Sequence, residues 1–183
     1  MTKTEARKLA KACRAAVDLH TVGHAMAGVL FALPAWQHAD TVLAFASMPD
    51  EPDTADILRQ ALAEGKRLLL PRVLSRTEMD WVEITALSQL QPGAYGILEA
   101  PASLPAFDTA HLGDGALALI PCLAASPDGV RLGRGGGYYD RFLAHYKGRR
   151  LLVCPTAALL GDLPCEGWDV RFSPHEILTE KGI

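Results

Sequence analysis

The sequence predicts a single α/β domain with a mainly parallel β-sheet and helices on both of its faces. Short apolar segments with the length of buried strands recur along the chain, and segments with helical spacing alternate with them. The 183 residues suit one domain with a sizeable core. No repeat or linker divides the chain, so we expect residues 1–183 to form one domain.

The first elements are expected to be two helices. Residues 3–19 place apolar side chains at helical spacing, and Thr2 or Thr4 is suited to cap the start. A second helix is predicted for residues 22–33, with Pro34 ending it.

A strand, a helix and a second strand follow. Residues 41–46 are short and apolar, as in a buried strand. Asp53 or Thr54 then caps a helix that runs to about residue 64 and ends at Gly65. Residues 67–70 form the next buried strand, which Pro71 is expected to close.

The remaining elements complete the alternation. Residues 80–84 alternate in polarity, as in an edge strand, and residues 116–120 and 150–154 are apolar strands. Residues 139–146 are expected to be helical between the last two. Ligands of such sheets bind beyond the carboxyl ends of the strands, so we expect a site at the loops after Ala46, Leu70 and Ile120.

Composition argues against several classes of function. The formal charge of −3 and the isoelectric point near 6.0 give no global basic footprint for nucleic acid. The longest apolar stretch, residues 116–125, is too short to span a bilayer, and the basic N-terminal segment lacks the apolar core of a signal peptide. The four cysteines are widely spaced, which favours reduced thiols in a cytoplasmic protein.

The most informative motif is the glycine-rich stretch at residues 128–140. Its five glycines allow backbone N–H groups to approach an anion closely, and Arg131 and Arg134 add fixed positive charge. Asp140 adds a carboxylate that is suited to a metal ion, so the stretch is suited to bind a nucleoside triphosphate. It matches neither a Walker A loop nor a dinucleotide fingerprint. The alternative is a glycine-rich turn whose Asp140 caps a helix.

A second group of charges lies on the first predicted helix. Lys3, Arg7, Lys11 and Arg14 share one face at helical spacing and border the apolar face. Their charged ends could therefore lie at the rim of a cleft. A solvated surface is the alternative.

Two acidic positions complete the candidates. Glu51 follows a predicted strand, where its carboxylate could meet a polar edge of a substrate, whereas Asp53 and Thr54 are better explained as helix caps. Asp169 lies in a late loop and by itself indicates no function. The histidines are scattered, and no motif predicts a hydrolase triad.

At these residues the chain resembles the 5-formyltetrahydrofolate cyclo-ligase family, also called 5,10-methenyltetrahydrofolate synthetase. The strongest match is the long stretch at residues 129–143. Weaker matches follow in the same order along the chain: Lys3 with Arg7, residues 47–51 with Thr54, residues 65–71, residues 95–97, Ile120-Pro121, Trp168-Asp169 and residues 177–179.

The resemblance implies an α/β/α sandwich similar to the phosphosugar isomerase and CoA-transferase group. It also implies a site for ATP and the folate. Residues implied to contact ATP are Lys3, Arg7, Arg131, Leu132, Gly133, Arg134, Gly135, Gly136, Gly137, Tyr138 and Tyr139. Residues implied to face the folate are Ala46, Glu51, Arg134, Gly135, Gly136, Gly137 and Tyr138.

The resemblance further implies that Arg134 and Tyr138 border both ligands as the catalytic residues and that Asp140 and Asp169 hold Mg²⁺. Three positions depart from the family pattern. Ala125-Ser126 stands where many members have Phe-Asp, Gly136 where some have Lys, and Glu99-Ala-Pro101 where Glu-Pro is expected.

The implied reaction is an ATP- and Mg²⁺-dependent closure of 5-formyltetrahydrofolate to 5,10-methenyltetrahydrofolate with release of ADP and phosphate. The γ-phosphoryl group moves to the formyl oxygen, and N10 then attacks. The expected partners are these small molecules, without nucleic acid or membrane, and the enzyme is expected to be a monomer. The alternatives are a phosphosugar or CoA-ester enzyme of the related fold, and a nucleotide-binding module without catalytic activity.

Overall fold

The computed structural model describes residues 1–93, 97–167 and 169–183, and its centre is a six-stranded sheet in the order β10-β9-β6-β1-β2-β3. Five strands run parallel to their neighbours, and edge strand β3 is antiparallel to β2. The strands are β1 (Thr41–Leu43), β2 (Arg67–Val73), β3 (Met79–Ile84), β6 (Ala116–Pro121), β9 (Arg149–Val153) and β10 (Ile177–Leu178). The predicted mainly parallel α/β sheet is confirmed.

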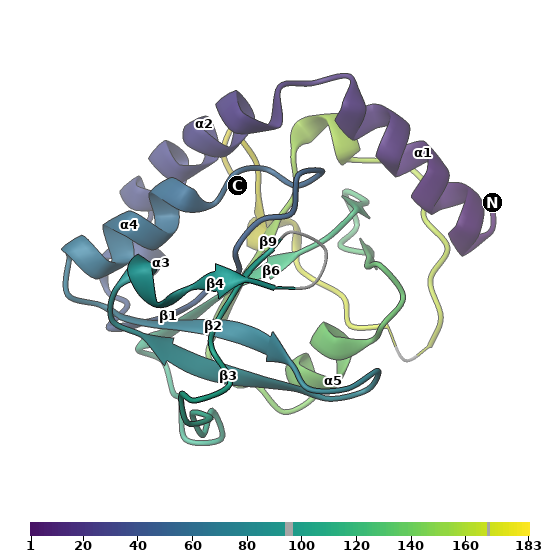
Figure 1. Ribbon diagram of the computed structural model, residues 1–183. Helices are drawn as coiled ribbons and strands as arrows, with labels where there is room; N and C mark the ends of the chain where they lie inside the picture. Colours follow the sequence, from purple (N-terminus) through teal and green to yellow (C-terminus); the bar gives the residue numbers. More distant parts are fainter. Residues whose placement is uncertain (94–96, 168) are drawn as a thin grey trace.

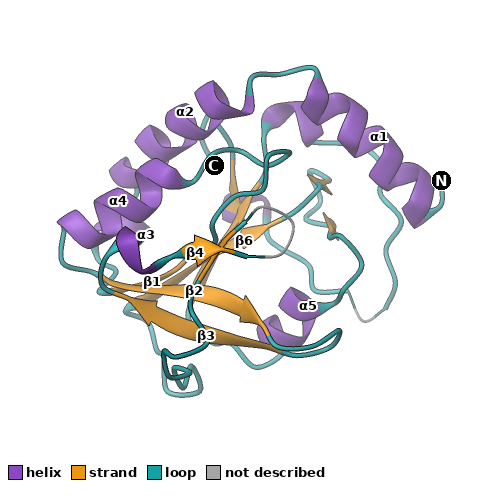
Figure 2. Ribbon diagram, in the orientation of Figure 1, coloured by secondary structure: helices purple, strands orange, loops and turns teal. Residues whose placement is uncertain are grey.

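Helices lie on both sides of this sheet (Figures 1 and 2). Helices α2 (Leu19–Ala32), α3 (Pro34–Gln37) and α4 (Ala55–Ala63) cover one face. The short helix α5 (Tyr138–Leu143) packs on the opposite face. Helix α1 (Lys3–Ala15) contacts strand β8 (Arg131–Leu132) and the 3₁₀ helix η3 (Thr156–Ala158), and this places the N-terminal helix beside the glycine-rich stretch.

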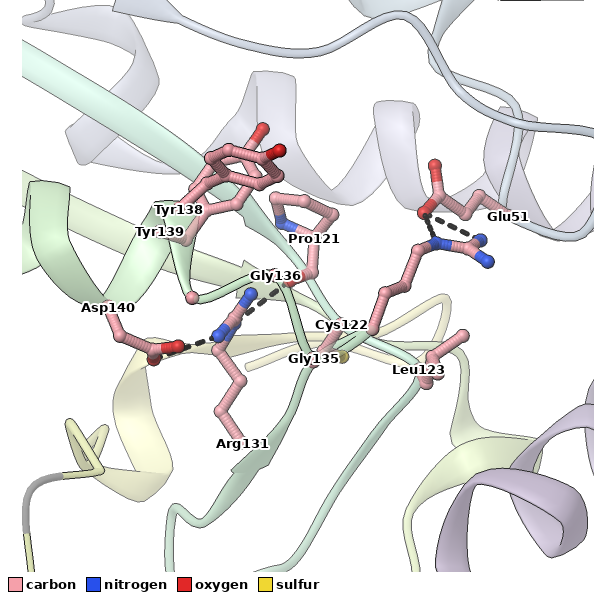
Figure 3. Close-up of a pocket in the computed structure, with 13 residues that line it drawn as sticks. Glu51, Pro121, Cys122, Leu123, Arg131, Gly135, Gly136, Tyr138, Tyr139 and Asp140 are labelled. Carbon is pink, nitrogen blue, oxygen red and sulfur yellow. Dashed lines mark hydrogen bonds and ion pairs between the residues drawn. The ribbon is translucent and has the colours of Figure 1, made fainter. Parts of the chain in front are cut away.

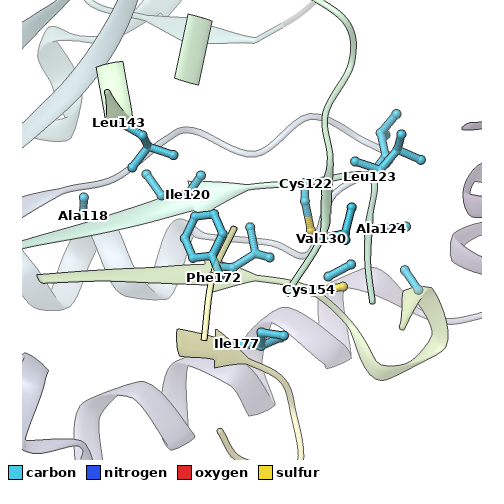
Figure 4. Close-up of a cluster of buried hydrophobic side chains, with 14 of the residues drawn as sticks. Ala118, Ile120, Cys122, Leu123, Ala124, Val130, Leu143, Cys154, Phe172 and Ile177 are labelled. Atoms are coloured by element: carbon cyan, nitrogen blue, oxygen red, sulfur yellow. The ribbon is translucent and has the colours of Figure 1, made fainter. Parts of the chain in front are cut away.

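The core has two parts, one on each face of the sheet. Side chains alternate along β6, so Leu117 and Leu119 join the cluster under α2 and α4, whereas Ala118 and Ile120 join the cluster under α1 and α5. Figure 4 shows the second cluster around Ile120. The central strands are therefore buried on both faces, as their continuous apolar sequences predict.

The predicted helix over residues 3–19 is wrong in its C-terminal part. Helix α1 ends at Ala15, and Asp18 begins α2 by accepting a hydrogen bond from the His20 backbone at 3.1 Å. Because Asp competes for backbone donors, it favours a new N-terminus over helix continuation. The predicted cap at Thr2 is confirmed, with a capping box to Glu5.

The bend between the first two helices also bears on membrane insertion. Within the described part of the chain, no single helix is long and apolar enough to cross a membrane. Helices α1 and α2 pass such a test only as a pair, and they are bent by 90° at their junction.

Two prolines were predicted to end elements, and only the first does. The predicted end of the second helix before Pro34 is confirmed, and Pro34 also begins α3, because the first turn of a helix does not need its N–H. Pro71 does not close its strand, since β2 continues to Val73. Strand β1 pairs with β2 only as far as Leu69, so Pro71 leaves no bond to β1 unmade.

Several boundaries and small elements differ from the expectations. Strand β1 is shorter than residues 41–46, and helix α5 is shorter than residues 139–146. The sequence did not predict the short strands and turns: β4 (Gln91–Pro92), β5 (Leu98–Glu99), β7 (Ala124–Ala125), β8, β10, η1 (Leu87–Gln89), η3 and η4 (Pro174–Glu176). Tyr95 of the family motif and Trp168 lie outside the described residues.

Candidate active site

The glycine loop, residues 133–137, connects β8 to α5 at the carboxyl-end side of the sheet. Gly135 and Gly137 adopt φ angles of 100° and 68°, which side chains other than glycine rarely adopt. A Cβ atom on Gly136 would lie 2.7 Å from the Tyr138 ring, so a larger residue there would require that ring to move. The glycines therefore fix the shape of the loop.

The charged cavity lies between the glycine loop and the N-terminal helix and has a volume of about 520 Å³. It brings together Lys3 and Arg7 from α1, residues of β8 and the glycine loop, and two acidic groups from the C-terminal region. Its lining residues are Lys3, Arg7, Arg131, Leu132, Gly133, Gly135, Gly137, Asp140, Arg141, Ala144, Glu166 and Asp169.

The apolar cavity lies on the other side of the loop, at the ends of β1 and β2, and has a volume of about 390 Å³. Most of its walls are apolar, but Glu51 and Arg134 also face it. Its lining residues are Phe45, Ala46, Met48, Glu51, Leu70, Pro71, Val73, Met79, Ile97, Leu98, Glu99, Pro121, Arg134, Tyr138 and Tyr139. This cavity lies at the loops after Ala46, Leu70 and Ile120, where the sequence predicts a site.

The junction cavity, about 160 Å³, lies between the other two and shares residues with both. It shares Arg131 and Asp140 with the charged cavity, and Glu51, Arg134 and Tyr138 with the apolar cavity. Figure 3 shows these groups around the glycine loop. Two ligands in the outer cavities would meet here.

Lys3 and Asp169 form an ion pair across the charged cavity, although 166 positions separate them in sequence. The Lys3 Nζ lies 2.9 Å from Asp169 Oδ2 and 2.5 Å from Glu166 Oε2. Burial opposes ionisation of both partners, but hydrogen bonds and opposite charge outweigh it. The pKa of Lys3 is therefore raised, and the pKa of Asp169 is lowered by the Glu166 backbone N–H and by Lys3.

Arg131 and Asp140 form a second pair. Arg131 donates through Nη1 to Asp140 Oδ1 at 3.1 Å and through Nε to the Pro121 carbonyl at 2.9 Å. Its guanidinium also lies over the Tyr139 ring at 5.5 Å. Burial, together with the charge of Glu51, raises the pKa of Tyr139 far above its ordinary value, so this phenol stays neutral.

Arg134 forms a third group of pairs with Asp50 and Glu51. Its Nη2 lies 3.0 Å from Glu51 Oε1 and 2.5 Å from Asp50 Oδ1. Burial disfavours both charged partners, but their attraction raises the pKa of Arg134 and lowers that of Asp50. Glu51 is only 8% exposed, and its second oxygen accepts a hydrogen bond from the Met48 backbone at 3.0 Å.

The loop that holds Glu51 is fixed by Thr54. The Thr54 hydroxyl donates to the Phe45 carbonyl at 2.7 Å and accepts from the Ser47 backbone at 3.1 Å. Thr54 is the N-cap residue of α4 as predicted, but the capping hydrogen bond comes from Asp53, which accepts from the Ala55 backbone at 2.8 Å. The loop thus starts and ends on fixed elements.

The basic face of α1 separates into three environments. Lys3 and Arg7 line the charged cavity, and the Arg7 Nε donates to the Gly133 carbonyl at 3.1 Å. Lys11 is exposed. Arg14 contradicts both interpretations, because it is 1% exposed and donates to the Cys122 and Leu123 carbonyls, so it neither reaches a rim nor faces solvent.

The departures from the family pattern have structural consequences near the site. Ser126 is buried, accepts a hydrogen bond from the Val130 backbone at 3.0 Å and donates to Asp128. It thereby holds the β7–β8 turn that leads into the glycine loop.

The side chain of Tyr138 is also held in place, because its hydroxyl donates to the Ser75 carbonyl at 2.7 Å.

The two predicted metal ligands line the same cavity. Asp140 and Asp169 both face the charged cavity, where each is paired with a cation. Among the described residues, no group of three or more His, Cys, Asp or Glu side chains is arranged to hold a metal ion. One or two carboxylates completed by phosphate oxygens and water is, however, a common arrangement for Mg²⁺.

The sequence did not identify three charged residues that line the site or pair with a residue of it. Arg141 directly follows Asp140, so its position next to the glycine-rich motif could have identified it from the sequence. Asp50 likewise precedes Glu51. Glu166 reaches Lys3 only through the folding of the C-terminal segment, and no local pattern marks it.

Known proteins resemble this chain over most of its length. The model of the 5-formyltetrahydrofolate cyclo-ligase family matches residues 2–180. A relative of that name from Mycolicibacterium smegmatis is 30% identical over 151 residues, covering 78% of this chain and 75% of the relative. One from Escherichia coli K12 is 32% identical over 137 residues, covering 72% of this chain and 74% of the relative.

Solved structures extend the similarity to the fold. The NMR structure of Aquifex aeolicus 5,10-methenyltetrahydrofolate synthetase superposes with a TM-score of 0.83 at 26% identity, covering all of this chain and 91% of the other. The synthetase from Mycoplasma pneumoniae superposes with a TM-score of 0.75 at 22% identity, covering 98% and 99% of the two chains.

Proposed function

The chain belongs to the 5-formyltetrahydrofolate cyclo-ligase family, and we propose that it uses ATP and Mg²⁺ to close 5-formyltetrahydrofolate to 5,10-methenyltetrahydrofolate. The family, its relatives and its structural neighbours establish the enzyme class and the cyclisation. The nucleotide, the metal ion and the residue roles are our proposal. We further propose that the enzyme acts as a monomer in the cytoplasm.

The main support for these roles is the junction cavity. It joins a cavity rich in paired charges to a cavity with apolar walls, and it has Arg134 and Tyr138 at its boundary. A triphosphate suits the first environment, and a flat aromatic ring with polar edges suits the second. A small, polar phosphosugar would leave the apolar walls unused, and a CoA-ester enzyme would need no pair of carboxylates for a metal ion beside the phosphates.

On the nucleotide side, Lys3, Arg7 and Arg131 supply positive charge beside the glycine loop. Residues 132–137 supply backbone donors, and the left-handed Gly135 and Gly137 allow a close approach of phosphate oxygens. Asp140 and Asp169 would hold Mg²⁺, which offsets the negative charge of the phosphates when bound. Lys3 and Arg131 would then exchange their carboxylate partners for phosphate oxygens.

On the folate side, Ala46, Met48 and Leu70 would contact the faces of the pterin. Glu51 would accept hydrogen bonds from its polar edge through lone pairs that Arg134 and the Met48 backbone leave available. The near-complete burial of Glu51 makes that contact specific, since an unpaired donor there would lose its solvation.

The chemistry requires activation of a poor electrophile. The N5 formyl group is an amide, because its nitrogen donates into the carbonyl. Transfer of the γ-phosphoryl group to the formyl oxygen creates a leaving group. N10 then attacks the same carbon, and phosphate departs with that oxygen and with the proton that N10 loses. Arg134 and Tyr138 line the junction cavity, and this position supports the proposal that they would stabilise the charge that develops during the transfer.

The decisive experiment follows the formyl oxygen. Substrate labelled with ¹⁸O in the formyl group is mixed with enzyme and Mg-ATP, and product is followed through the methenyl chromophore. We expect the label to appear in inorganic phosphate in a single turnover. Methenyl product accompanied by unlabelled phosphate would contradict direct phosphorylation, and absence of methenyl product would contradict the function itself.

A further inference from the structure

The cations around the glycine loop differ in whether a carboxylate neutralises them. Lys3, Arg131 and Arg134 each form an ion pair with a carboxylate. In the part of the chain that the structure describes, Arg7 and Arg141 form none, although both line the charged cavity. Each instead donates to a carbonyl of the glycine loop, Arg7 to Gly133 and Arg141 to Gly136.

Arg141 is held against the glycine loop by two contacts. Its Nη2 donates to the Gly136 carbonyl at 2.8 Å, and its guanidinium lies 5.4 Å from the centre of the Tyr138 ring. Arg141 follows Asp140 in the last turn of α5, and its backbone N–H donates to the Gly137 carbonyl at 3.1 Å. The side chain is thus positioned without losing its charge to an acidic neighbour.

This arrangement leaves most of the guanidinium available to a ligand. A guanidinium has five N–H donors, and the Gly136 carbonyl takes one position on Nη2. The side chain is exposed and lines the cavity, so its remaining N–H donors keep their hydration when no ligand is bound. Planar donors of this kind match the oxygens of a phosphate group.

We propose that Arg141 binds a phosphate group of the nucleotide, in addition to the residues of the glycine loop. The same contact fixes Gly136 and Tyr138, so phosphate binding in the charged cavity and the position of Tyr138 at the junction are linked through one side chain. This inference rests on the proposed use of ATP in that cavity.

The test is direct binding of Mg-ATP by calorimetry to the wild type and to the variants Arg141→Met and Arg141→Lys. Arg141→Met should weaken ATP binding about 10- to 100-fold, the range for a lost hydrogen bond to a charged group. Arg141→Lys should recover part of the affinity because it keeps the charge. Inorganic tripolyphosphate, as a competitor of ATP, should lose affinity for Arg141→Met by a similar factor.

Lys147→Met is the matched control, because it removes the same charge from an exposed position that lines none of the three cavities. It should bind ATP within about twofold of the wild type. ATP binding to Arg141→Met that equals the wild type would overturn the inference. A loss of ATP affinity in Arg141→Met without a loss of tripolyphosphate affinity would also overturn it, because Arg141 would then not bind a phosphate group.

The outcomes separate this inference from the proposed function. A wild type that binds ATP but forms no methenyl product would refute the function, while the binding series would still decide on Arg141. Methenyl formation together with unaltered ATP binding by Arg141→Met would refute the Arg141 inference alone.

Discussion

The charged cavity and the apolar cavity share the glycine loop, but different parts of the chain build them. The charged cavity depends on pairs between distant segments, such as Lys3 with Asp169 and Arg7 with Gly133. The apolar cavity is made largely by residues that follow β1 and by residues of β2, together with Tyr138 and Tyr139. The first is therefore held by electrostatic pairs that a ligand can exchange, and the second by the sheet.

The difference indicates how each side would bind its ligand. Carboxylates neutralise Lys3 and Arg131 in the charged cavity. Under the proposed function, these carboxylates would become available to a metal ion when phosphate oxygens bind the two cations. The apolar cavity needs no such exchange, since its walls gain from losing water. Substitutions in the two cavities should therefore affect the two substrates separately.

The largest effect is expected for Asp140→Asn. This change removes a proposed metal ligand, so turnover should fall by at least about 100-fold, the scale of losing a group that stabilises transition-state charge. Unfolding free energy should drop by only about 1–2 kcal/mol, because Asn keeps an acceptor for Arg131. Methenyl formation and chemical denaturation measure the two quantities. Near-normal turnover at saturating Mg²⁺ would show that Asp140 is only structural.

On the apolar side, Glu51→Gln should raise the folate KM by about 10- to 100-fold and leave the ATP KM nearly unchanged. The variant keeps the size of the side chain but replaces the charged carboxylate by a neutral amide. Initial rates with each substrate varied in turn provide the measurement.

Asp50→Asn is a suitable control for the Glu51 variant, because Asp50 pairs with the same arginine but lines none of the three cavities. Its folate KM should change much less. Equal changes in both variants would mean that Glu51 acts only by holding Arg134.

On the charged side, Lys3→Ala should weaken ATP binding by about 1–3 kcal/mol, while the folate KM changes much less. Lys11→Ala, an exposed residue on the same helix, serves as the control and should have no effect. Calorimetry with Mg-ATP measures both variants. Equal losses of affinity for both substrates would indicate a folding defect. An unaltered ATP affinity would mean that Lys3 is only a solvated surface residue.

The smallest expected effect is the pH dependence of the Lys3–Asp169 pair. The folded-state pKa of Asp169 lies below its ordinary value of 3.8, so the pair stabilises the fold above that pH and the contribution is lost as pH falls through the folded-state pKa. The pKa of Lys3 is raised above 10.5, so the contribution is also lost at still higher pH. Between these limits Lys3→Ala should cost at most about 1 kcal/mol.

Denaturation of wild type and Lys3→Ala at several pH values tests this dependence. The difference between their unfolding free energies should be flat near neutral pH and should shrink in acid. A difference that stays constant down to pH 2 would show that the ion pair contributes nothing.

Sequence pattern was sufficient wherever the physical signal was local. The continuous apolar stretches of β6 and β9 identified strands buried on both faces, and the alternation of β3 identified an edge strand. The glycine loop was visible because its backbone conformations require glycine at Gly135 and Gly137. These features depend on residues that are neighbours in the chain.

Tertiary structure decided what depends on residues that meet only after folding. Helical spacing placed Lys3, Arg7, Lys11 and Arg14 on one face of a helix. The bend after α1 and its packing against β8 put these residues in three environments: a cavity for Lys3 and Arg7, solvent for Lys11 and the core for Arg14. Glu166 and Asp169 reach Lys3 across the whole length of the chain. Periodicity defines which way a side chain leaves its own helix, whereas its charge partner is defined by the surface that packs against that helix.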